Sequence, residues 1–79
     1  MDSKIIEDVK RIAFSVLEDD RINTEADFDM SQAEKMDSVN RVAILVAIEN
    51  EYDFIFKLKE ISSWNTVMEL AAIVESKQD

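Results

Sequence analysis

The chain has 79 residues and contains no glycine, proline, cysteine or histidine. A chain of this length forms one domain, and without disulfides its core must come from the 47% of residues that are hydrophobic. The formal net charge of −9 disfavours binding to nucleic acid and to anionic lipid, and it favours basic partners. Tight hairpins depend on glycine, so the composition favours helices joined by ordinary loops. We therefore expect an all-α fold with a single domain over residues 1–79.

The amino-terminal segment, from about Ser3 to Glu18, carries apolar residues at helical spacing. This pattern predicts an amphipathic helix capped by Asp2 or Ser3. Its apolar stripe consists of Ile5, Val9, Ile12 and Val16. No basic region followed by a long apolar run opens the chain, so we expect neither a signal peptide nor membrane insertion. The absence of cysteine is compatible with the cytosol, and a cytoplasmic location is the default expectation.

Residues 19–36 are polar and acidic, and they predict a long loop after the first helix, with a short helical turn near Ser31 to Lys35. Loops of this length in small domains are often functional. Asp27, Asp29 and Ser31 alternate like the start of an EF-hand, but Gln32 stands where that template needs glycine. We therefore expect no calcium site and no other metal site here.

The second half of the chain predicts two further principal helices. The run from Ser38 to about Tyr52 is apolar around most of its circumference, which indicates a central helix with neighbours on several sides. The stretch 54–56 is expected to be an extended connector that packs into the core, and 57–61 a short helix. Thr66 and Glu69 match a capping box at the start of the last helix, and Trp64 is expected to be a packing anchor. The expected architecture is three principal helices plus one short helix.

The motif Asp37-Ser38-Val39 stands where the second long helix begins. A serine in the first turn of a helix lies near free backbone N–H groups and the positive end of the helix dipole, where an anion is stabilised. The chain has no histidine or cysteine to activate this serine, so the position suits a phosphate ester better than a nucleophile, and we expect no enzymatic activity. Serine and aspartate are also preferred helix caps, and capping alone would explain these two residues.

At this point the chain resembles the acyl carrier proteins, the phosphopantetheine-dependent carriers of fatty acid, polyketide and peptide synthesis. These proteins share the expected helix order and have an Asp-Ser-Leu-type motif at the start of the second long helix, which here reads Asp37-Ser38-Val39. The stretch from Val42 to Asp53 is similar to the hydrophobic second helix of the family and its acidic, aromatic end.

The resemblance implies a site and a set of partners. Ser38 would carry 4′-phosphopantetheine, whose thiol forms thioesters with acyl or aminoacyl groups, and Asp37 would help a phosphopantetheinyl transferase engage the serine. Acyl-activating and acyl-transferring enzymes with basic patches would be further partners of a monomeric carrier. The residues expected to flank the arm or meet partners are Met36, Val39, Asn40, Arg41 and Val42. Four apolar positions are either ordinary core residues or walls of an interior that shelters the acyl chain: Ile12, Leu45, Ile48 and Val67.

Departures from the family pattern indicate a specialised carrier in fatty acid, polyketide or envelope-lipid biosynthesis. Lys35 stands where the family commonly has glycine, and Asn40, Arg41 and Ala43 occupy a helix face that usually carries acids. The fragments 47–50 and 64–66 are similar to stretches of D-alanyl carrier proteins, so an aminoacyl carrier is an alternative. A second alternative is an acidic helical interaction module that is never modified.

Overall fold

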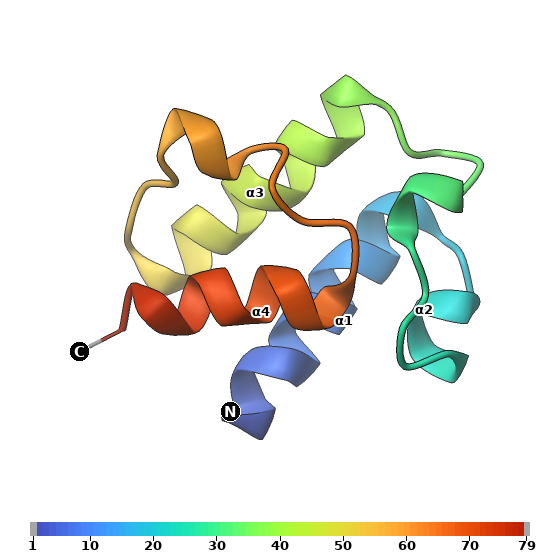
Figure 1. The fold of residues 1–79 in the computed structure, drawn as a ribbon, viewed down its shortest axis with the longest axis horizontal. Coiled ribbons are helices and arrows are strands. Elements are labelled where there is room, and N and C mark those ends of the chain that lie inside the picture. Colours follow the sequence, from blue (N-terminus) through green and yellow to red (C-terminus); the bar gives the residue numbers. More distant parts are fainter. Residues whose placement is uncertain (1, 79) are drawn as a thin grey trace.

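The computed structural model describes residues 2–78, and within them every regular element is helical (Figure 1). The three principal helices are α1 (Ser3–Leu17), α3 (Ser38–Tyr52) and α4 (Val67–Ser76). A short helix, α2 (Arg21–Thr24), and two 3-10 turns, η1 (Met30–Gln32) and η2 (Leu58–Glu60), lie in the connections. The predicted all-α fold with three principal helices is confirmed.

The ends of α1 and α3 are set by the residues that flank them. The Asp2 carboxylate accepts a hydrogen bond from the Lys4 N–H at 2.9 Å and caps α1. Both helices stop at a residue in the left-handed region, Glu18 with φ 54° and Asp53 with φ 59°. This conformation is usual after a helix but is normally taken by glycine, which the chain lacks.

Helix α4 begins with the predicted capping box. The Thr66 hydroxyl accepts from the Glu69 N–H at 3.1 Å, and the Glu69 carboxylate accepts from the Thr66 N–H at 3.1 Å. The same carboxylate oxygen accepts from the Asn65 N–H at 2.8 Å. These bonds satisfy backbone donors that have no partner inside the helix.

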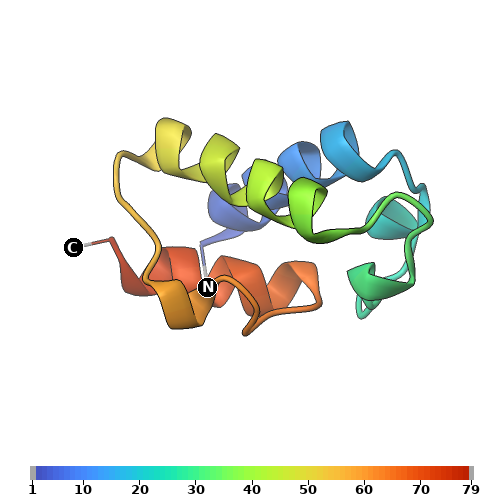
Figure 2. The same cartoon turned by 90° about the horizontal axis from the view of Figure 1, so that it is seen from above.

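The central helix is α1, which corrects the expectation that the Ser38–Tyr52 helix would be surrounded. Helix α1 packs against α3, α4 and α2, and Figure 2 shows α1 and α3 on one side of the molecule with α4 on the other. Helix α3 instead buries one face and leaves a row of apolar residues in solvent: Val39, Val42 and Val46. An apolar circumference therefore does not by itself mean a buried circumference.

The core lies where α1, α3 and α4 meet, and Trp64 is completely buried in it, as predicted. The four candidate interior residues are all buried as well: Ile12, Leu45, Ile48 and Val67. Trp64 precedes α4 and supplies the largest of the fully buried side chains. A tryptophan side chain buries on the order of 150–250 Å², more than an aliphatic core residue can.

The connection between α1 and α3 is more structured than a plain loop. It contains α2 and η1, and its turn spans Met30–Gln32, slightly before the predicted position. Its side chains Ile22, Phe28 and Met30 are buried in the core. The Met30 N–H also donates to the Asn65 carbonyl at 2.7 Å, which joins this connection to the segment before α4.

The connector after α3 belongs to no helix or strand, and only part of it packs inward. Phe56 is buried and its ring meets the edge of the Phe54 ring at a centroid distance of 4.8 Å, whereas Ile55 between them is exposed. The short helix expected at 57–61 is the 3-10 turn η2, and Leu58 in it is exposed. Within the described residues, no helix combines the length and the apolar character that crossing a membrane requires.

Candidate functional site

Ser38 is the first residue of the 15-residue helix α3, and the aspartate before it caps the helix. Asp37 has an extended backbone, and its Oδ1 accepts a hydrogen bond from the Asn40 N–H at 2.7 Å. The sequence left open whether serine or aspartate would cap. The structure assigns this role to Asp37, so capping explains the aspartate but not the serine.

The Ser38 side chain is exposed at the positive end of α3. An ester on its oxygen would project into solvent from a helix terminus that stabilises negative charge. Lys35 and Arg41, each three residues from Ser38, are both engaged elsewhere: the Lys35 ammonium group pairs with the Glu18 carboxylate, and the Arg41 guanidinium binds the Trp64 carbonyl. The helix terminus is therefore the main local source of positive potential at Ser38.

The turn before Ser38 is fixed by the Asn40 side chain. Its Nδ2 donates to the Lys35 carbonyl at 2.8 Å, which ties the first turn of α3 to the chain that precedes the motif. The Asn40 backbone N–H binds Asp37 at the same time. Asn40, expected as a partner contact, therefore plays a structural role, since it holds residues 35–37 in the conformation that presents Ser38.

An exposed apolar row runs along α3 from the serine. Val39 is 73% exposed, and Val42 and Val46 are each 45% exposed. Their spacing of three and four residues places Val42 and Val46 on one face of the helix, with Val39 at its beginning. Met36 is half-buried and packs against the core. Val39 and Val42 are thus placed as expected for an apolar surface next to the serine, while Met36 contributes mainly to the interior.

The Arg41 side chain binds another part of the chain. Its Nη1 donates to the Trp64 carbonyl at 2.8 Å and to the Ile61 carbonyl at 3.5 Å, and its Nη2 donates to Asn65 Oδ1 at 3.2 Å. The guanidinium carbon lies 4.2 Å from the centroid of the Trp64 ring, within the range of a cation–π contact. The positive charge expected to meet partners is thus held against residues 61–65.

The described surface also has a hollow of about 510 Å³ that is lined by residues 17–21 at the end of α1 and by Gln32, Glu34 and Lys35. Charged side chains dominate its lining, and two of its acids already pair with its two cations: Asp19 with Arg21, and Glu18 with Lys35. Such a polar lining does not suit an alkyl chain.

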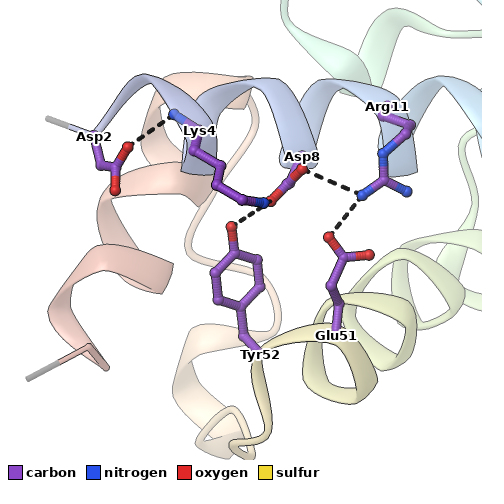
Figure 3. A network of polar contacts seen from close by, with 6 residues as sticks. All are labelled: Asp2, Lys4, Asp8, Arg11, Glu51 and Tyr52. Atoms are coloured by element: carbon purple, nitrogen blue, oxygen red, sulfur yellow. Dashed lines mark hydrogen bonds and ion pairs between the residues drawn. The ribbon is translucent and has the colours of Figure 1, made fainter.

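Sequence reasoning missed a polar cluster that joins α1 to the end of α3 (Figure 3). Asp8 Oδ2 accepts hydrogen bonds from Lys4 Nζ at 2.8 Å and from the Tyr52 hydroxyl at 2.6 Å. Arg11 Nη2 reaches Asp8 Oδ1 at 3.3 Å and Glu51 Oε2 at 2.6 Å. The only sequence signal was the spacing of Lys4, Asp8 and Arg11 along one helix, which places them on a common face.

No protein-family model, curated protein or solved structure matches this chain.

Proposed function

We propose that this chain is a phosphopantetheine-dependent carrier protein with its attachment site at Ser38. The observation that carries the proposal is the position of Ser38, an exposed hydroxyl at the first residue of α3 that the helix does not use as its cap. The Asp37-Ser38-Val39 motif, the order of the helices and the net charge of −9 support the same assignment.

The bound arm would supply the thiol that a chain without cysteine cannot provide, and so the capacity to form thioesters. The protein's own residues would present the attachment oxygen. Asp37 and Asn40 fix the turn, and the start of α3 stabilises the negative phosphodiester. Asp37 would also present a carboxylate to the transferase that modifies the serine, which uses magnesium and coenzyme A.

The exposed row of α3 would serve as the contact surface for partner enzymes. Val39, Val42 and Val46 offer apolar area, and the net charge of −9 would steer basic patches of acyl-activating and acyl-transferring enzymes toward the protein. We propose a specialised carrier, in fatty acid, polyketide or envelope-lipid biosynthesis, because Asn40, Arg41 and Ala43 replace the acids usual on this face. An aminoacyl cargo, as in D-alanyl carriers, is the alternative within the same class.

A competing function is an acidic helical module that docks to a partner without being modified. The exposed row of valines on α3 favours this function equally, because exposed apolar surface mediates contacts with or without a prosthetic group. The two functions differ in one respect only, which is the covalent chemistry at Ser38.

The deciding experiment is intact-mass measurement after incubation with a broad-specificity phosphopantetheinyl transferase, coenzyme A and magnesium. Wild type and the control variant Ser62→Ala, which removes another exposed serine, should each gain one phosphopantetheine mass. Ser38→Ala should gain none, and circular dichroism should show that it is folded. An unmodified wild type would favour the interaction module, and modification of Ser38→Ala would show that the attachment site lies elsewhere.

A further inference from the structure

Residues 57–63 form a short segment that the core holds only weakly. It lies between two buried anchors, Phe56 and Trp64, which are 6% and 0% exposed. None of its own side chains is buried, and Leu58 at its centre is 85% exposed. Ile61 is the one side chain of the segment that packs, half-buried, against the core cluster. We call residues 57–63 the strap.

The backbone hydrogen bonds within the strap are all local. The Glu60, Ile61 and Ser63 N–H groups donate to carbonyls three residues earlier, at 2.9, 3.2 and 3.4 Å. Such bonds close single turns and do not connect the strap to α1, α3 or α4. The strap can therefore separate from the helices without breaking any of the bonds that form them.

Two polar contacts from neighbouring helices hold the strap in place. Lys77, just after α4, pairs with Glu60 at 2.9 Å, and both side chains are only 17% exposed. Arg41 of α3 reaches the Ile61 carbonyl at 3.5 Å while it binds the Trp64 carbonyl at 2.8 Å. The ion pair with Lys77 is thus the stronger of the two contacts made by the strap itself.

The closed strap leaves one buried donor without an acceptor. The Trp64 indole Nε1 is buried and has no hydrogen-bond partner among the described residues. A buried donor without a partner costs free energy, and that cost disappears when water reaches the group. Trp64 directly follows the strap in the chain, so opening of the strap would give water a route to this group. The relief of its cost would lower the free-energy difference between the closed and open states.

We propose that the strap opens as a unit while α1, α3 and α4 remain folded, that the Glu60–Lys77 ion pair is its latch, and that opening gives solvent access to Trp64. Regions with little buried side-chain area and only local hydrogen bonds open at free energies well below that of global unfolding. The proposal is independent of any modification of Ser38, because it rests on residues 56–65, Arg41 and Lys77 alone.

The test compares hydrogen exchange of the Ile61 amide with exchange of the Leu45 and Ile48 amides in the middle of α3. Lys77→Met removes the latch from the side of α4 without altering the strap. Lys10→Met is the matched control, because the one ion pair of Lys10 among the described residues, with Glu7, is long at 3.9 Å and lies on α1, which makes no backbone hydrogen bond with the strap. Acrylamide quenching of Trp64, the only tryptophan in the chain, is the second readout.

In wild type the Ile61 amide should exchange at least about tenfold faster than the α3 amides. Lys77→Met should speed exchange at Ile61 by about three- to tenfold and increase quenching of Trp64, with no change at Leu45 and Ile48. Lys10→Met should leave both readouts unchanged. Equal acceleration of strap and α3 amides would mean that Lys77 affects only global stability. Quenching in Lys77→Met no greater than in Lys10→Met would also overturn the proposal.

Discussion

The hydroxyl of Tyr52, the last residue of α3, donates a hydrogen bond of 2.6 Å to Oδ2 of Asp8 in α1. Hydrogen bonds from Lys4 and from Tyr52 lower the pKa of Asp8 to about 2, against the opposing effect of burial. Burial and the neighbouring Asp8 carboxylate raise the pKa of Tyr52. The carboxylate therefore stays ionised and the phenol protonated, and the pair fixes the end of α3 against the central helix (Figure 3).

Replacing Tyr52 with Phe should lower the free energy of unfolding by about 1.5–3 kcal/mol, because the hydrogen bond goes to a charged acceptor that is largely buried. Urea denaturation of wild type, Tyr52→Phe, Asp8→Asn and the double variant gives the coupling between the two side chains. We expect the Tyr52→Phe effect to shrink markedly in the Asp8→Asn background. Strictly additive effects of the two substitutions would mean that the hydrogen bond between the two side chains does not contribute to the free energy of unfolding.

Stability should fall in acid over a window set by Asp8. Its pKa drops from 3.8 to about 2 on folding, so its contribution is complete above about pH 4 and is lost as the pH falls through 2. The melting temperature of wild type should therefore decline more steeply between pH 4 and 2 than that of Asp8→Asn. Other carboxylates also titrate here, so the difference between the two curves is the relevant quantity. Parallel curves would show that Asp8 has an ordinary pKa in the folded protein.

Substitutions of Asp37 and of Ser38 should differ in how much they lower the free energy of unfolding. Asp37→Ala removes the cap and should cost about 0.5–2 kcal/mol. Ser38→Ala removes an exposed hydroxyl that does not cap the helix and should change stability by less than about 0.5 kcal/mol. Urea denaturation of the two unmodified variants tests this directly. A larger loss for Ser38→Ala than for Asp37→Ala would return the capping role to the serine.

The left-handed residue after α3 offers a stabilising substitution. Asp53 has φ 59° and ψ 53°, a conformation that costs an L-residue energy and costs glycine little. Asp53→Gly should raise the free energy of unfolding by about 0.5–1 kcal/mol, after allowance for the greater freedom of glycine in the unfolded chain. Asp53→Ala is the control, since it removes the carboxylate but keeps the steric cost, and thermal unfolding should rank it below wild type. A lower stability of Asp53→Gly than of wild type would instead show that the carboxylate stabilises the turn by more than the steric relief that glycine brings.

The sequence predicted the features that a few neighbouring residues determine, and it did not predict contacts between residues far apart in the chain. The start of α3 and the capping box of Thr66 and Glu69 were predictable, because a few consecutive residues determine them. The contact of Arg41 with the Trp64 carbonyl spans 23 positions and that of Tyr52 with Asp8 spans 44, and no local pattern encodes either. Helix composition alone could not show which helix is central, because it does not reveal which apolar faces are covered.

The same limit applies to the candidate site. The motif placed Ser38 at a helix start, and the exposure of Val39 and Val42 matches the apolar surface expected beside it. The side-chain directions of Asn40 and Arg41 were not predictable, because both depend on carbonyl groups outside the helix. Helical position therefore indicated which residues are near the serine, but not which of them are available to a partner.

The last prediction concerns the charge on the outer face of α3 and rests on the proposed carrier function. Substitution of Arg41 cannot test this charge, because its loss would break the contacts with residues 61–65. Ala43 is exposed, so Ala43→Glu adds a negative charge to the face with little effect on packing. If basic patches on fatty acid elongation enzymes select their carriers by charge, the modified Ala43→Glu protein should react with a ketosynthase about two- to tenfold faster than wild type at low salt. The advantage should fall as the ionic strength rises above about 0.1 M, where the screening length is roughly 10 Å.

Ala43→Gln, which adds a similar side chain without charge, is the control and should react like wild type. Equal rates for the Glu and Gln variants at every salt concentration would mean that charge on this face does not select the partner enzymes.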